Sequence, residues 1–237
     1  MAQSPEEIVA FFNLTENDSN PTLPLNWNVA PTNEIYIVKD QGPDSENRIL
    51  DHASWGLIAP WQKNFVDARA SQSHAINARS ESIHEKPTFH DAFRTSRCLI
   101  PATGYYEWAT SLGKYPPKQP FYITSADGSP LSIAGICSTW RSEKGEIIQS
   151  ASIITREAVD ELATIHSRMP VFMARDRWDE WLDPRNRDIE KLQALMSHPN
   201  PAAGLITRPV SPRVNLVANN GPGIIDEYEL GEPETLF

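Results

Sequence analysis

Three polar side chains lie in sequence surroundings that could give them chemical roles. Glu107 falls within residues 105–108, where aromatic neighbours would desolvate an inward-facing carboxyl group. Desolvation raises the pKa of a carboxyl group and suits it to proton transfer near neutral pH. His166 follows an apolar helical pattern, and Asn77 precedes by two residues Arg79, whose guanidinium could bind a phosphate.

Each of these side chains also has a purely structural explanation. A glutamate on an amphipathic strand can point into solvent, and a histidine cation at the C-terminal end of a helix is stabilised by the helix dipole. Arg79 could form a surface ion pair with Glu81. Taken singly, the three positions leave catalysis and structure as open alternatives.

The common motifs of phosphate, metal and nucleophile sites do not occur in the sequence. It contains neither GxGxxG nor GxxxxGK[ST], and it contains no CxxC, HExxH or GxSxG. We therefore expect no bound metal ion and no organic cofactor.

Composition excludes several classes of protein. The chain has 237 residues, of which 40% are hydrophobic, and only two cysteines. No stretch reaches the roughly 18 consecutive apolar residues that a membrane helix needs, and the first residues lack a secretory signal pattern. Two cysteines cannot form a disulfide framework and fit a reducing compartment, so we expect a cytoplasmic protein.

The charge distribution limits how the protein can bind nucleic acid. The net charge of −10 argues against a protein that coats DNA by bulk attraction. Residues 61–120, however, hold eight Lys and Arg against five acidic residues. Because charges are screened beyond about 8 Å at physiological salt, a locally basic face can exist on an acidic protein.

The elements that must position these side chains are predicted to be mostly strands. Short segments rich in β-branched and aromatic residues, bounded by Gly, Pro, Asp or Ser, occur at residues 34–38, 53–58, 98–100, 105–108, 121–124, 131–137 and 147–154. Asp127-Gly128, between two of these segments, indicates a hairpin.

Helices are predicted at both ends of the chain. Ser4-Pro5-Glu6-Glu7 is typical of a helix start, with a capping serine and a glutamate three residues later. Later helical patterns cover residues 157–166, 177–182 with Asp176 as its cap, and 189–196. Many strands with few, segregated helices predict a single α+β domain built on a mostly antiparallel sheet.

Seven fragments that follow one another in a fixed order strengthen the functional interpretation. They are Asn28-Val29-Ala30-Pro31, Trp55-Gly56-Leu57-Ile58-Ala59-Pro60-Trp61, Ile76-Asn77-Ala78-Arg79-Ser80-Glu81, Glu85-Lys86-Pro87-Thr88-Phe89, Arg97-Cys98-Leu99-Ile100-Pro101-Ala102-Thr103-Gly104-Tyr105-Tyr106-Glu107-Trp108, Ile165-His166-Ser167-Arg168-Met169-Pro170 and Asn219-Asn220-Gly221-Pro222. In this order they resemble the signature of the SRAP family, the SOS response-associated peptidases or abasic-site processing proteins. The resemblance covers about residues 3–226 and leaves residues 227–237 as an acidic C-terminal tail.

The resemblance implies a barrel-like, bifurcated sheet and a specific chemistry. Family members bind single-stranded DNA that contains an abasic site and form a covalent DNA–protein crosslink. The aldehyde of the ring-opened sugar condenses with the amine and the thiol of an N-terminal cysteine to give a thiazolidine. An α-amine with a pKa of about 7.7–8.0 is partly neutral at cellular pH, unlike a lysine at about 10.4, and can attack an aldehyde. Lyase-type and autopeptidase activities are implied as well.

Carried over position by position, the resemblance assigns roles to nine residues. It implies that Glu107 is the acid/base group, that His166 assists sugar ring opening and proton transfer, and that Asn77 positions the N-terminal group. The expected DNA-binding residues are the phosphate-binding Arg79 and Arg168 and the groove-lining Trp61, Trp108, Pro31 and Thr155.

The chain departs from the family pattern at its first residues. The family opens with Met-Cys-Gly-Arg-Phe, whereas this chain opens with Met1-Ala2-Gln3-Ser4. Neither Cys98 nor Cys137 can replace the missing nucleophile, because an internal cysteine has no free α-amine. Two explanations stay open: a shortened form of an active protein, which we favour, and a natural variant without the nucleophile. We expect the chain as given to form no thiazolidine.

Three other functions remain as alternatives. The protein could bind single-stranded or junction DNA without a covalent step, act as a peptidase on its own N-terminus, or serve as a scaffold without chemistry. The expected partner is single-stranded DNA with abasic sites, with no membrane and no obligate protein partner. We expect a cytoplasmic location, associated with the nucleoid after damage if the source is bacterial.

Overall fold

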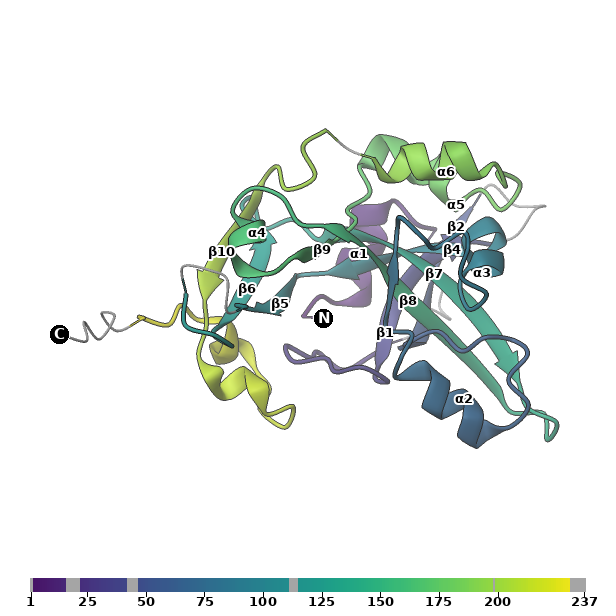
Figure 1. Ribbon diagram of the computed structural model, residues 1–237, viewed down its shortest axis with the longest axis horizontal. Coiled ribbons are helices and arrows are strands. Elements are labelled where there is room, and N and C mark those ends of the chain that lie inside the picture. Colours follow the sequence, from purple (N-terminus) through teal and green to yellow (C-terminus); the bar gives the residue numbers. More distant parts are fainter. Residues whose placement is uncertain (1, 16–21, 42–46, 111–114, 198, 231–237) are drawn as a thin grey trace.

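The computed structural model describes residues 2–15, 22–41, 47–110, 115–197 and 199–230 (Figure 1). Met1 lies outside the described residues. Residues 231–237, most of the expected acidic tail, also lie outside them. None of the described helices is both long and apolar enough to cross a membrane.

The larger of two sheets closes into a barrel. Its strands are β1 (Glu34–Asp40), β2 (Arg48–Trp55), β3 (Asn77–Arg79), β4 (Arg97–Ala102), β7 (Leu131–Arg141), β8 (Ile147–Glu157) and β9 (Arg168–Pro170). Strands β2, β1, β4, β7 and β8 pair in that order, and β8 returns to β2 through a short parallel pairing. The short strands β3 and β9 also pair with β8.

Both faces of the barrel wall are buried. In β1, Ile35 and Ile37 join the cluster inside the barrel, whereas Tyr36 and Val38 join the cluster outside it. Side chains of a strand alternate between the two faces of a sheet. The outer face is covered by α1 (Pro5–Phe12), α3 (His90–Thr95), α5 (Trp178–Leu182) and α6 (Ile189–Met196). This two-sided burial explains the consecutive buried residues of β1 and β4.

Helix α1 begins as the sequence predicts. The Ser4 side chain accepts a hydrogen bond from the backbone N–H of Glu7 (3.3 Å), and the Glu7 carboxylate accepts one from the backbone N–H of Ser4 (2.8 Å). This reciprocal pair satisfies two donors that a helix start leaves without partners. Ile8 and Phe12, on the inner face of the helix, are fully buried.

The second sheet branches from the barrel. It contains β5 (Gly104–Trp108), β6 (Pro120–Ser125) and β10 (Leu205–Pro209), with β6 in the middle and β5 at one edge. Only Thr103 separates the end of β4 from the start of β5, so one stretch of chain passes from the barrel wall into the second sheet (Figure 1). The predicted α+β class, with a mostly antiparallel, barrel-like and bifurcated sheet, is confirmed.

Several predicted elements are wrong in extent or pairing. Residues 157–166 do not form one helix: Glu157 ends β8, and only α4 (Leu162–Ile165) is helical. Asp160, between them, has a left-handed φ of 52°, which no regular helix contains. The turn at Asp127-Gly128 does not make a hairpin, because β6 belongs to the second sheet and β7 to the barrel.

The chain between the predicted elements contains further structure. Asp176 does not cap the helix near residue 177, because a 3₁₀ turn at Arg175–Arg177 precedes α5, which lacks a side-chain cap. The predicted strand at 53–58 ends at Trp55, since Gly56 adopts a φ of +119°. Strands β3, β9 and β10 and the helices α2 (Phe65–Gln72) and α3 were not predicted.

Candidate active site

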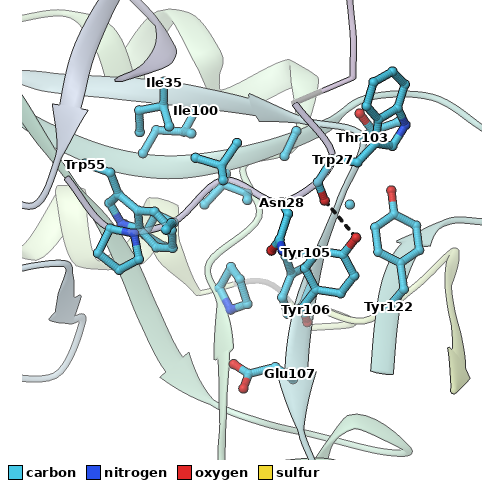
Figure 2. Close-up of a pocket in the computed structure, with 18 of the residues that line it drawn as sticks. Trp27, Asn28, Ile35, Trp55, Ile100, Thr103, Tyr105, Tyr106, Glu107 and Tyr122 are labelled. Carbon is cyan, nitrogen blue, oxygen red and sulfur yellow. Dashed lines mark hydrogen bonds between the residues drawn. The ribbon is translucent and has the colours of Figure 1, made fainter. Parts of the chain in front are cut away.

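A cavity of about 400 Å³ opens where the barrel and the second sheet diverge (Figure 2). Its wall is mostly apolar and aromatic, with polar groups at a few points. The lining residues that the sequence analysis singled out are Pro31, Asn77, Glu107, Trp108 and Thr155. The cavity therefore combines an apolar wall with a small number of polar groups, as small-molecule and substrate sites do.

Glu107 faces the cavity from the edge strand β5, and its side chain is only 26% exposed. Burial raises the pKa of its carboxyl group to about 7, against the opposing effects of His166 and of the backbone N–H of Trp108, which donates to the carboxyl. The expectation that an inward-facing Glu107 has a raised pKa is confirmed. At neutral pH this carboxyl group can both hold and release a proton.

His166 contacts Glu107 through its imidazole ring. It caps the C-terminal end of α4, and its Nδ1 lies 3.5 Å from Oε2 of Glu107. The same Nδ1 accepts a hydrogen bond from the backbone N–H of Arg168 (3.2 Å). The Arg168 carbonyl oxygen lies equally close to Nδ1 (3.2 Å), so which ring nitrogen carries the proton depends on the tautomer. His166 therefore contacts a carboxyl group that lines the cavity, although His166 itself is not among the lining residues.

Asn77 and Arg79 lie on one face of the short strand β3. β3 pairs in parallel with β8, placing Asn77 opposite Ile153 and Arg79 opposite Thr155. Asn77 lines the cavity, whereas the intervening Ala78 points into the core. Because side chains alternate along a strand, Arg79 shares the exposed face with Asn77.

The first described residue of the chain also reaches the cavity. Ala2 is part of its lining, and the backbone nitrogen of Ala2 donates a hydrogen bond to Oγ1 of Thr103 (3.1 Å), at the junction of β4 and β5. The structure therefore brings together Asn77, Glu107 and the start of the chain, with His166 in contact with Glu107.

The remaining predicted residues are distributed around this site. Arg168 does not point freely outward, because its guanidinium binds Glu81 and the Thr155 carbonyl. The alternative ion pair between Arg79 and Glu81 is not formed, since the partner of Glu81 is Arg168. Trp61 is not among the lining residues; it lies in the turn before α2 and is 51% exposed.

Sequence reasoning missed the aromatic wall and the loop that closes one side of the cavity. The Tyr106 hydroxyl donates to the Trp27 carbonyl (2.7 Å), as Figure 2 shows. Burial raises the pKa of the Tyr105 and Tyr106 hydroxyls, which therefore stay protonated at neutral pH. The buried amide of Asn28 donates to three carbonyl oxygens of one loop, those of Val214, Leu216 and Asn219.

These tyrosines stand next to Glu107 in the sequence, so the aromatic cluster itself carried a signal. The partners of Asn28 are distant in the sequence and carried none. Among the residues that the structure describes, no three His, Cys, Asp or Glu side chains are grouped as metal ligands.

The chain is an α+β protein in which Ala2, near the start of the chain, lines a cavity between a closed barrel and a second sheet. The profile of the SOS response associated peptidase (SRAP) family matches residues 1–217, and the chain belongs to this family.

Named relatives align with most of this chain. YoqW from Bacillus subtilis is 34% identical over 227 residues, which cover 94% of this chain and 95% of the relative. YoaM from the same organism is 36% identical over 200 residues, covering 84% of each chain. Both are named abasic site processing proteins, as is the more distant HMCES from Rattus norvegicus at 29% identity, of which the match covers 68%.

Solved structures share the fold. A crystal structure of a protein from Bacteroides thetaiotaomicron has a TM-score of 0.76 at 22% identity and covers 97% of this chain and 98% of that one. A protein from Bordetella bronchiseptica has a TM-score of 0.70 at 27% identity, with 89% and 97% covered.

Proposed function

We propose that the protein processes abasic sites in single-stranded DNA, and that a form carrying an N-terminal cysteine crosslinks covalently to the ring-opened sugar. The names of the relatives support abasic-site DNA as the substrate class. The observation that carries the proposal is the placement of Glu107, with a pKa of about 7, in the cavity that the start of the chain enters.

The proposed reaction forms a thiazolidine and releases one water molecule. The α-amine attacks the aldehyde carbon, and the resulting carbinolamine loses its oxygen as water to give an imine. The thiol then adds to the imine carbon, its proton passing to the nitrogen, so that no oxidant or reductant is needed. Glu107 and His166 would deliver the proton to the departing oxygen and remove the one that the amine loses.

The position of Ala2 is compatible with a cysteine that reacts inside the cavity. Ala2 contacts Thr103 at the cavity wall. The family sequence Cys-Gly-Arg-Phe, placed between Met1 and Ala2, would add four residues that span at most about 14 Å. Because Asn77 and Glu107 line the same cavity as Ala2, we place the added cysteine in that cavity.

The test compares two forms of the protein with a single-stranded oligonucleotide that contains one abasic site. The form with Cys-Gly-Arg-Phe inserted after Met1, once its methionine is removed, is expected to give an adduct that survives denaturing electrophoresis. The chain as given is expected to give none. An oligonucleotide with a tetrahydrofuran in place of the sugar is the matched control, because it lacks the aldehyde.

Two results would contradict the proposal. One is the absence of an adduct from the extended form while the abasic strand remains intact. The other is a stable adduct of the chain as given that mass spectrometry maps to Met1. Replacing Glu107 by Gln in the extended form is expected to slow adduct formation by about 10²-fold or more, the usual contribution of a positioned acid/base group.

A noncovalent DNA-binding protein is the second candidate. Arg79 favours it, because within the described chain this exposed guanidinium forms no hydrogen bond or ion pair and is free to bind a phosphate. Salt distinguishes the two: noncovalent complexes dissociate as salt rises, whereas a crosslink persists.

Either activity requires a location where DNA is present, and the free thiols Cys98 and Cys137 fit a reducing cytoplasm.

A further inference from the structure

The guanidinium of Arg168 is occupied by a carboxylate of the same chain. Nη1 of Arg168 donates to Oε1 of Glu81 (2.7 Å), and Nη2 donates to Oε2 (2.9 Å). Nη2 also donates to the Thr155 carbonyl oxygen (2.8 Å). The two parallel bonds to Glu81 use the end of the guanidinium fork, the geometry in which arginine binds carboxylates and phosphates alike.

This ion pair stands at the edge of the candidate active site. Thr155, which anchors Arg168, is part of the cavity lining, and the backbone N–H of Arg168 orients His166. The Arg168 side chain is 22% exposed and that of Glu81 is 53% exposed, so solvent and a DNA strand can reach the pair from the Glu81 side. A phosphate that approached Arg168 end-on would meet the Glu81 carboxylate first.

The carboxylate is present at every pH at which the protein is expected to work. The hydrogen bonds and the charge of Arg168, together with the nearby charge of Arg79, lower the pKa of Glu81 to about 2. Protonation therefore does not release Arg168 in the physiological range. Only a competing anion can take the place of Glu81.

We propose that Glu81 is an internal phosphate mimic that occupies the phosphate-binding end of Arg168 and weakens noncovalent binding to DNA. This inference rests on the proposed function. A DNA phosphate must displace the Glu81 carboxylate, so part of the attraction between Arg168 and DNA is lost. Undamaged single strands are thereby held weakly, and retention on DNA depends on the covalent step at an abasic sugar. Glu81 is in this sense a specificity-determining residue.

The test measures the affinity of the chain as given for an undamaged single-stranded oligonucleotide by fluorescence anisotropy at several salt concentrations. Glu81→Gln is expected to bind DNA about three- to tenfold more tightly than the wild type. This range corresponds to the loss of one partly exposed ion pair that competes with the phosphate. The salt dependence is expected to steepen by about 0.7 in log–log slope, one additional phosphate contact on single-stranded DNA.

A matched control variant separates this effect from a change in net charge. Glu85→Gln removes the same charge four residues further on, where the carboxylate is 69% exposed and its one ion-pair contact is with His84 at 3.6 Å. Adding Arg168→Gln to Glu81→Gln is expected to abolish the gain, because the gain requires the free guanidinium.

Each outcome decides the proposal. Tighter binding by Glu81→Gln than by Glu85→Gln, lost on removal of Arg168, supports it. Equal affinities of the two variants overturn it, since charge alone would then account for the effect. Weaker binding by Glu81→Gln overturns it as well, because Glu81 would then orient Arg168 for DNA. If the extended form crosslinks but the variants do not differ, only the role of Glu81 fails. If neither binding nor crosslinking is seen, the proposed function fails with it.

Discussion

The buried carboxyl group of Glu107 should make the stability of the protein depend on pH. Its pKa of about 7 lies well above the ordinary value of 4.5, with burial as the largest cause. A carboxyl group whose pKa is raised on folding stabilises the folded state below the unfolded pKa. That contribution is lost as pH rises through the folded pKa. One pKa unit corresponds to about 1.4 kcal/mol. The difference between the two pKa values therefore lowers the free energy of unfolding by about 3 kcal/mol between pH 4.5 and pH 8.

Glu107→Gln isolates this contribution, because glutamine has nearly the same shape and carries no charge. Near pH 5 the two proteins are expected to have similar free energies of unfolding, since both side chains are neutral. Above pH 8 the variant should be more stable by about 3 kcal/mol, because the wild type must bury a carboxylate. Urea denaturation at pH 5, 7 and 8.5, with the difference plotted against pH, measures the effect.

A second glutamate–histidine pair provides the control. Glu34 lies 3.5 Å from His52, the same separation as in the Glu107–His166 pair, but the Glu34 side chain is 57% exposed. Glu34→Gln should therefore change stability by less than about 1 kcal/mol at any of these pH values. The reasoning would be refuted if the difference in unfolding free energy between wild type and Glu107→Gln did not grow with pH. It would also be refuted if the wild type were more stable than the variant at pH 8.5.

Two further substitutions test the supports of the site. Asn28→Ala removes the donor to three carbonyls of residues 214–219, so we expect a loss of about 2 kcal/mol in urea denaturation and faster amide hydrogen exchange in that loop. Arg97→Lys replaces a buried guanidinium that donates to four backbone carbonyls, among them that of Trp181 (2.6 Å). A lysine has three donors on one atom and cannot reach them all, so we expect a loss of about 2–4 kcal/mol, seen as a lower thermal midpoint.

Local patterns predicted the long strands and the capped helix but not the short elements. β1 and β8 contain several β-branched residues each, so they are recognisable from composition. β3 and β9 have three residues each, and both exist through their pairing with β8, which no local pattern records. The helix predicted over residues 157–166 failed for a related reason. Its apolar residues Ala158, Leu162 and Ile165 are buried against the second sheet, so their spacing reflects tertiary packing rather than a regular helix.

The candidate site could be predicted in part for similar reasons. Glu107 lies between aromatic residues of its own strand, so the sequence predicted a raised pKa for an inward-facing side chain, but the structure was needed to show that it faces inward. The partner of Arg168 could not, because Glu81 is 87 residues away and Arg79 offered a nearer candidate. The contact of Ala2 with Thr103 likewise depends on how the chain passes from β4 into β5. Properties that depend on adjacent residues could be predicted from the sequence. Properties that depend on contacts between distant strands required the structure.

Glu107 and Glu81 have different pKa values because their surroundings differ. Glu107 is buried and has a pKa of about 7, whereas Glu81 is paired with Arg168 and has a pKa of about 2. At neutral pH Glu107 can therefore exchange a proton, and Glu81 can act only as a fixed negative charge. The two are connected through residues 166–168, since His166 contacts Glu107 and Arg168 contacts Glu81. A phosphate that displaced Glu81 would bind beside the segment that orients His166. Strand binding and proton transfer would then depend on the same three residues of the chain.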